Sequence, residues 1–169
     1  MKNPELALKY AIFVTAQVLI WNFCDFSQYV MLCFLPALIM YLPINHGYIY
    51  SMVFAFAIGF AVDFLSSGML GLTAAALLPV AFMRVAIINM VFGSELFSRE
   101  ENLSLRKQGA PKMLTCIVLS TALFLAVYIW ADGAGTRPFL FNLLKFFLSL
   151  GLSSLVSYFV IRILESENR

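Results

Sequence analysis

Three charged side chains lie inside long apolar stretches of the sequence, and their types and spacing give the first indication of chemistry. They are Asp63, Arg84 and Lys145. A charge at the centre of a bilayer costs roughly 2.5–3.5 kcal/mol on insertion scales, so such residues are candidates for function by default. One interpretation is a polar cluster that binds a ligand or partner, or relays protons. The other is an internal ion pair together with an arginine whose head is drawn toward the membrane interface.

The depths of these residues favour a pair between Asp63 and Lys145. Asp63 lies about four residues, roughly 6 Å, from the outer end of its predicted helix. Lys145 lies about six residues, roughly 9 Å, below the same surface, whereas Arg84 lies about 15 residues, roughly 22 Å, from it. No second carboxylate falls within a predicted span, so the sequence gives little support to a proton relay.

Patterns that indicate catalysis or a cofactor are missing from the sequence. It has no Ser-His-Asp set, no P-loop, no glycine-rich dinucleotide motif and no pair of carboxylates suited to one pocket. His46 lies in a Pro-Asn-Gly turn without a second metal ligand at a suitable spacing. Cys24, Cys33 and Cys116 form no CxxC motif and are interpreted as buried thiols, with a Cys24–Cys33 disulfide as the alternative. We therefore predict a protein that is not an enzyme and holds no metal or cofactor.

The composition requires the segments that carry these residues to be membrane helices. Of 169 residues, 62% are hydrophobic and only 12% are charged, whereas soluble domains are about 45–50% apolar and about 25% charged. A chain of this size cannot hide so much apolar surface from water. An ordinary soluble domain, a disordered chain and a nucleic-acid binder are therefore excluded. The apolar runs are continuous rather than alternating, which predicts helices and not a β-barrel.

Charged residues and turn signals divide the chain into six predicted spans of one integral membrane domain, residues 1–169. A helix needs about 20 apolar residues to cross the hydrocarbon layer. Trp21, Asn22 and Phe23 are too bulky for a signal-peptide cleavage site, so the first span is interpreted as a retained helix. Residues 43–47 contain the Pro, Asn and Gly of a turn. The spans are about 6–24, 28–42, 48–65, 69–92, 113–131 and 139–163, with five spans as the alternative.

The distribution of lysine and arginine predicts the orientation of these spans. Six spans place the termini on the same side as the 42–48 and 93–112 loops. The opposite side carries Arg137 alone, so both termini are expected to be cytoplasmic. The 94–112 loop is interpreted either as a docking site for a cytoplasmic partner or as a plain connection. The basic residues on the termini side are Lys2, Lys9, Arg99, Arg106, Lys107, Lys112, Arg162 and Arg169.

Small residues frame Asp63 in the sequence. Gly59 and Asp63 share one face of their predicted helix at a spacing of four, and Gly71 and Ala75 do the same on the next helix. Small residues let helix backbones approach closely in lipid. Gly68 and Gly71 permit a tight reversal between the two helices. The residues alone therefore predict a closely packed helical hairpin.

The pattern G-x-x-x-D-x-x-x-x-G-x-x-G, at Gly59, Asp63, Gly68 and Gly71, resembles the core motif of the MreD family. MreD proteins are rod shape-determining membrane proteins of the bacterial cell-elongation machinery. The resemblance covers most of the chain in length and hydropathy profile, but only residues 59–75 in motif. One departure is the 42–48 turn, where the family often carries basic residues.

The resemblance to MreD implies a non-catalytic component of the bacterial inner membrane. Such proteins sit with MreC and act with the MreB filament, RodA and a class B penicillin-binding protein in peptidoglycan synthesis and cell shape. Their fold resembles the six-helix substrate-binding subunits of ECF-type vitamin transporters. The expected mechanism is assembly, in which small-residue faces and the Asp63–Lys145 pair hold a partner's transmembrane helix. The alternative is a small-ligand-binding subunit of an ECF-like transporter, which needs a polar central cavity.

Overall fold

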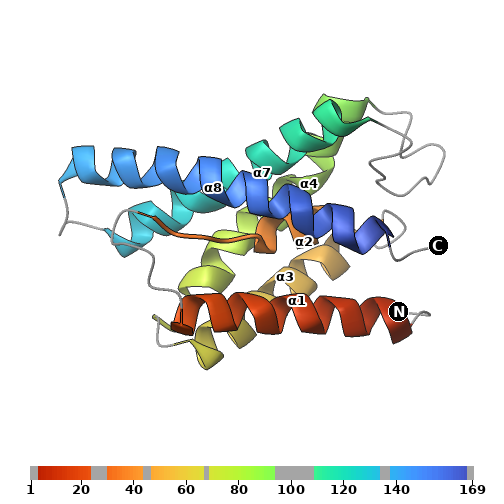
Figure 1. Ribbon diagram of the computed structural model, residues 1–169, viewed down its shortest axis with the longest axis horizontal. Helices are drawn as coiled ribbons and strands as arrows, with labels where there is room; N and C mark the ends of the chain where they lie inside the picture. The colour runs from red at the N-terminus through yellow and green to blue at the C-terminus, as the bar shows by residue number, and fades with distance from the viewer. Residues whose placement is uncertain are drawn as a thin grey trace.

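The computed structural model describes residues 4–23, 30–43, 47–66, 69–93, 109–133 and 138–166 of the chain. These residues form an all-helical structure (Figure 1). The helices are α1 (Pro4–Phe23), α2 (Leu35–Met40), α3 (Tyr48–Leu65), α4 (Leu72–Phe92), α7 (Ala110–Asp132) and α8 (Phe139–Ser166).

Four of these helices, α3, α4, α7 and α8, are long and apolar enough to cross a membrane. Their outward faces carry large apolar side chains such as Ile49 on α3, Met90 on α4 and Leu140 on α8, each about four-fifths exposed. Soluble monomers rarely expose contiguous apolar surface of this extent. The protein is therefore membrane-embedded, and the predicted all-α class is confirmed.

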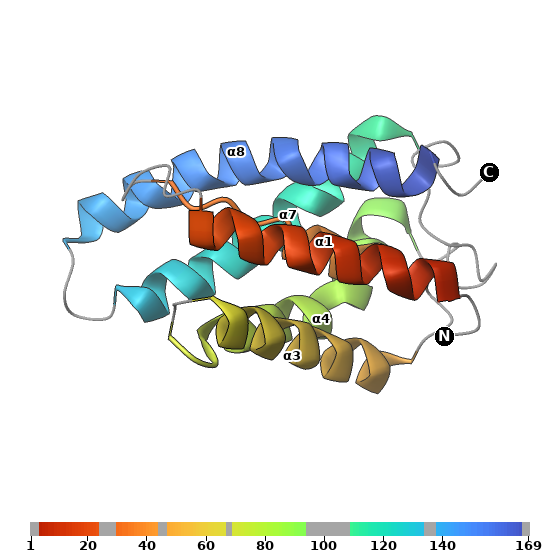
Figure 2. The same ribbon diagram turned by 60° about the horizontal axis from the view of Figure 1, so that its bottom comes forward.

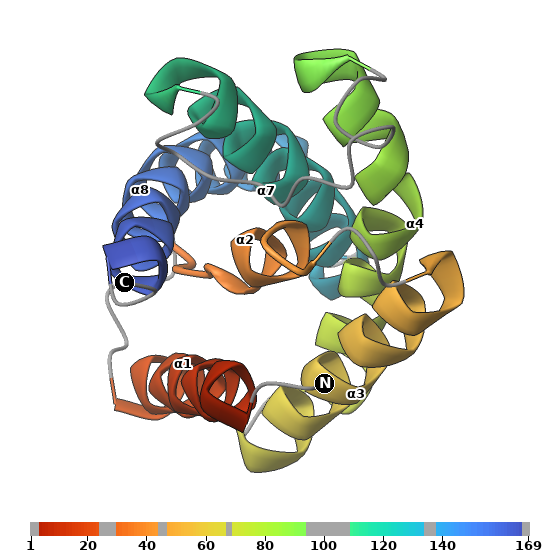
Figure 3. The ribbon, with the colours of Figure 1, turned by 90° about the vertical axis from the view of Figure 1, so that its right-hand side faces the viewer.

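The five long helices surround α2. Viewed along the bundle, α1, α3, α4, α7 and α8 enclose the short α2 helix (Figure 3). Helices α3, α4, α7 and α8 pack as successive neighbours, and α1 packs against α3 and α2. In the view of Figure 2, α1 runs between α8 and α3. Helix α1 begins, and α8 ends, at the same end of the bundle (Figure 1).

Five of the six predicted ranges agree with helices of the structure to within three residues at either end. Polar turns and glycines set these boundaries, and they are visible in the sequence. Helix α4 begins three residues later than expected because Gly71 adopts a φ of +89° directly before it. That left-handed conformation cannot be part of an α-helix and is strained for residues other than glycine.

The prediction of a membrane-spanning helix over residues 28–42 is wrong. In the described part of this range, residues 31–34 are not helical, Phe34 (φ −114°, ψ 5°) is the N-cap of α2, and the only helix is α2, with six residues. Residues 31–33 are called the extended segment below. All six residues of α2 are buried. Extended backbone advances about 3.3 Å per residue, against 1.5 Å in a helix, so a short extended stretch returns the chain through the bundle. Uniformly apolar sequence does not distinguish such a buried segment from a helix in lipid.

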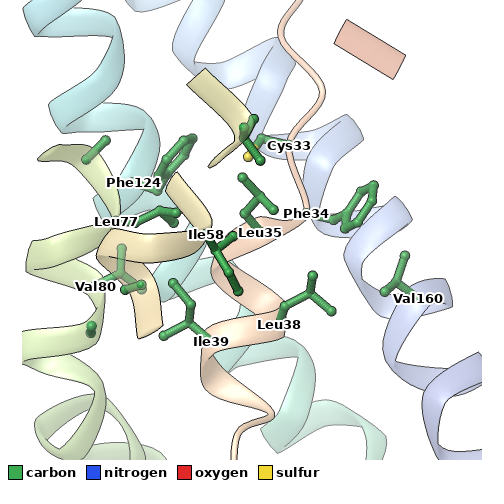
Figure 4. Close-up of a cluster of buried hydrophobic side chains, with 14 of the residues drawn as sticks. Cys33, Phe34, Leu35, Leu38, Ile39, Ile58, Leu77, Val80, Phe124 and Val160 are labelled. Carbon is green, nitrogen blue, oxygen red and sulfur yellow. The ribbon is translucent and has the colours of Figure 1, made fainter. Parts of the chain in front are cut away.

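Side chains of the extended segment and α2 form the centre of the core. Leu35 and Leu38 are fully buried, and they pack with Ile58 of α3, Leu77 of α4 and Phe124 of α7. Figure 4 shows these side chains converging on α2 from the surrounding helices. The central position in the ring of helices is therefore filled by protein side chains.

Serines of α8 bind the backbone of the extended segment on one side. Ser149 Oγ accepts the backbone N–H of Met31 at 2.8 Å. Ser153 Oγ accepts the N–H of Cys33 at 3.1 Å and donates to the carbonyl of Met31, also at 3.1 Å. Four helical residues advance about 6 Å, and two extended residues advance about 6.6 Å. The two repeats match, so serines four residues apart on α8 serve alternate residues of the segment.

Polar side chains of α1 bind the other side of the segment. Gln17 donates from Nε2 to the carbonyl of Leu32 at 2.9 Å and accepts the N–H of Phe34 at 3.1 Å through Oε1. Trp21 Nε1 donates to the same Leu32 carbonyl at 2.8 Å. Non-helical backbone within a bilayer is tolerated only where protein or water satisfies its polar groups. Helices α1 and α8 together provide the hydrogen-bond partners that this backbone needs.

Candidate functional site

Asp63, the charged residue of the motif, caps the start of α4. Its side chain is only 3% exposed. Its Oδ2 atom accepts the backbone N–H of Thr73 at 3.0 Å and that of Ala74 at 3.3 Å. Gly71 precedes α4 and has no side chain to cap these groups. The carboxylate from α3 therefore takes the role of an N-cap and lies at the positive end of the α4 dipole.

The glycines of the motif have two different structural roles. A Cβ atom on Gly59 would lie 2.5 Å from Ala74 Cα and 2.7 Å from Ala74 N, so α3 and α4 approach too closely for any side chain. Gly71 has open space around its Cα, and only its positive φ calls for glycine. The predicted packing face of α4 is offset by one residue, because Ala74 is buried and Ala75 is exposed. Gly68 lies outside the described residues.

The predicted pair between Asp63 and Lys145 is wrong. Lys145 Nζ lies 3.5 Å from Oδ2 of Asp132, the last residue of α7. The depth estimated from the sequence places Lys145 at the correct end of the bundle. Depth does not specify which helix lies next to α8 at that level. Helix α8 packs against α7, so the carboxylate at the end of α7 reaches Lys145, and Asp63 binds α4 instead.

Arg84 lies toward the opposite end of the bundle from Asp63. Its side chain is 3% exposed. One terminal nitrogen, Nη1, donates to Ser51 Oγ in the first turn of α3 at 3.2 Å. The other, Nη2, donates to the carbonyl of Leu42, two residues after the end of α2. A cation is favourable at the carboxyl end of a helix, so Arg84 holds the end of the buried segment.

Sequence reasoning missed the residues that hold the extended segment and the partner of Lys145. Ser149, Ser153 and Ser157 recur every fourth residue on α8, and all three are fully buried. This repeat of serines in an otherwise apolar helix indicates that polar groups of another segment pack against it. Gln17 is likewise a fully buried polar residue in an apolar helix, α1. Asp132 falls between the predicted spans 113–131 and 139–163, so it was not considered as a partner of Lys145.

The titratable groups do not form a metal or disulfide site in the described part of the chain. Cys33 and Cys116 are buried free thiols, as predicted. No group of three histidine, cysteine or acidic side chains gathers among the described residues. Cys24, His46 and residues 94–108, which make up most of the predicted 94–112 docking loop, lie outside them.

Comparisons of the chain with family models, with curated proteins and with solved structures find no match.

Proposed function

We propose that this chain is a non-catalytic component of the bacterial rod-shape complex, resembling MreD, which organises peptidoglycan synthesis through helix packing in the inner membrane. The α3–α4 hairpin carries this proposal. Gly59, Asp63 and Gly71 belong to the pattern that resembles the MreD motif, and each has a defined structural task at the hairpin. A motif used for internal packing supports an assembly role more than catalysis.

The arrangement of the helices agrees with the proposed topology. Helix α1 begins and α8 ends at one end of the bundle (Figure 1), and the basic residues favour that end as the cytoplasmic one. Both termini are then cytoplasmic. The partners would be an MreC-like protein, together with RodA, a class B penicillin-binding protein and MreB. Contacts inside the bilayer would use the outward faces of α3, α4, α7 and α8.

The alternative of an ECF-like small-ligand subunit has less support. Such a subunit needs a polar cavity at the centre of its helices. Here α2 occupies that position, and its six residues are all buried. Asp63 and Lys145 also have partners within the chain rather than in a shared cavity.

Depletion in the bacterium of origin tests the proposal. Loss of the chain should turn rods into round cells, and the tagged chain should co-purify with an MreC-type protein. Re-expression of the wild type or of Gly151→Ala should restore rods, because a Cβ on Gly151 meets no neighbouring atom. Gly59→Ala should restore them poorly. Depleted cells that remain rod-shaped, with no MreC-type protein bound to the tagged chain, would overturn the proposal.

A further inference from the structure

The row of buried serines on α8 has one more member than the extended segment uses. Ser149 binds Met31, and Ser153 binds both Met31 and Cys33. Ser157 lies one turn further along α8 and is fully buried, and its Oγ atom has no hydrogen-bond partner among the described residues. A buried hydroxyl without a partner costs free energy, so a backbone group that reached Ser157 would be stabilised there.

Leu35 is the residue that the repeat assigns to Ser157. The serines recur every four helical residues and their partners every two extended residues, so Leu35 follows Met31 and Cys33 in this series. Leu35 instead begins α2, because the chain turns at Phe34, which has a ψ of 5°. The φ of Phe34, −114°, lies in the extended range. A change in this one ψ angle therefore continues the extended backbone to Leu35, and α2 already packs against α8.

The sequence at the start of α2 favours an extended Leu35. Leu35 precedes Pro36, and the proline ring disfavours the helical region for the residue before it. Pro36 itself is suited to the first position of a helix, where no N–H group is needed. The Leu35 N–H group now binds the Cys33 thiol, which is a weak acceptor. A helix that begins at Pro36 and frees Leu35 for a hydroxyl acceptor agrees with all three observations.

The hydrogen bonds that oppose this change are few. The bonds from the extended segment to α1 and α8 all lie before the ψ angle of Phe34, so a rotation there leaves them intact. The bonds that are lost run from the Ala37 and Leu38 N–H groups to the Phe34 carbonyl, at 3.1 and 3.4 Å. The bond that forms joins the Leu35 N–H group to Ser157. Two bonds are exchanged for one, so the extended form of Leu35 is the minor state.

Lengthening the extended backbone moves α2 toward the end of the bundle where α1 begins. A residue that changes from helical to extended backbone adds about 1.8 Å. The shift of α2 is therefore about 2 Å for one residue and about 4 Å for two. Arg84 fixes the far end, because its Nη2 atom donates to the Leu42 carbonyl, and a shift of this size breaks that bond.

We propose that α2 and the extended segment form a two-state conformational device. In the second, minor state Phe34 and Leu35 are extended, and the Leu35 N–H group binds Ser157. Arg84 then releases Leu42. The two states connect the serines of α8 with Arg84, so a change at either place alters the other. This device does not depend on the proposed place of the chain in the rod-shape complex.

NMR relaxation dispersion on the full chain in detergent micelles tests the device, because it measures exchange with minor states on the microsecond to millisecond timescale. We expect dispersion at the amides of Leu35, Ala37 and Leu38, whose bonds differ between the states, and a flat profile at Met31. Ser157→Ala removes the acceptor of the second state and should lower its population about tenfold, the effect of one hydrogen bond. If Ser157 only fills space, its replacement changes the melting temperature but not the dispersion.

Ser154→Ala is the matched control, because the Ser154 hydroxyl binds the Gly151 carbonyl of its own helix, and dispersion should persist in this variant. Ser157→Cys keeps a side chain of similar shape with a weaker acceptor and should give an intermediate population. Arg84→Lys loses the planar fork that holds Leu42 and should raise the population; an unchanged population there would overturn the connection between the two places. Flat profiles in the wild type, or equal dispersion in Ser157→Ala and Ser154→Ala, would overturn the device itself.

Discussion

Replacing Gly59 by alanine tests the close contact of α3 and α4 on which the hairpin depends. The new Cβ would lie 2.5 Å from Ala74 Cα, whereas ordinary van der Waals contacts begin at 3.4 Å. The obstacle is backbone, so no side-chain rotation can relieve it. The two helices must separate by about 1 Å, and a gap of that size forfeits roughly a quarter to a half of the dispersion energy of each affected contact.

Two opposing terms determine the size of the effect. Overpacking a close contact costs about 1–3 kcal/mol, and a backbone obstacle places Gly59→Ala near the upper end of that range. Alanine also favours the helix over glycine by about 1 kcal/mol. The expected net loss is therefore about 2 kcal/mol, which corresponds to a melting temperature lower by about 4–8 °C for a chain of this size.

Gly151 provides the matched control for this substitution. It lies inside α8, is exposed, and would bring a Cβ near no other atom. Gly151→Ala should therefore show the propensity term alone and raise stability by up to about 1 kcal/mol. Thermal unfolding of both variants in one detergent measures the difference. If Gly59→Ala is as stable as Gly151→Ala, the close approach of α3 and α4 is not what requires glycine at position 59.

Further substitutions address three other contacts. Asp63→Ala should cost about 1–2 kcal/mol through loss of the α4 cap, whereas Asp63→Asn keeps an acceptor and should cost less; equal thermal stability of the two variants would argue against the cap. Ser153→Ala removes two hydrogen bonds from buried backbone groups and should cost about 1–3 kcal/mol, with faster alkylation of Cys33. Ser154→Ala should leave stability nearly unchanged, because its hydroxyl binds the Gly151 carbonyl of its own helix. A similar loss of stability in both serine variants would contradict a stabilising role for the hydrogen bonds between Ser153 and the backbone of residues 31 and 33. Lys145→Met should cost less than about 1 kcal/mol, because both partners of its ion pair are partly exposed; a larger loss that persists in high salt would show that the pair is effectively buried.

The helices of this protein were largely predictable because their boundaries are chemical. Polar turns and glycines interrupt apolar runs of about 20 residues, and those interruptions are legible in the sequence. The α3–α4 hairpin was predictable for the same reason, since Gly59 and Asp63 are spaced to share a face. Its details were not. Which alanine of α4 packs against Gly59, Ala74 or Ala75, depends on the residue at which α4 begins. That residue depends in turn on the left-handed φ of Gly71.

The interior of the bundle was not predictable from composition. Residues 31–40 are as apolar as a membrane helix, yet most of them face protein, and their backbone contacts are set by residues far away in the sequence. The partner of Lys145 was missed for a related reason. Sequence gives a residue's height in the membrane, whereas the neighbour at that height follows from the order of helices around the ring.

The contacts of the extended segment also constrain the biosynthesis of the protein. The bonds from Met31 and Cys33 to the serines of α8 join positions 118 to 122 residues apart. A ribosome releases α8 only after every other described helix. Until then, Gln17 and Trp21 of α1 can bind Leu32 and Phe34, but hydrocarbon cannot supply acceptors for the N–H groups of Met31 and Cys33. It follows that this segment reaches its full set of hydrogen bonds only when the last helix of the bundle is in place.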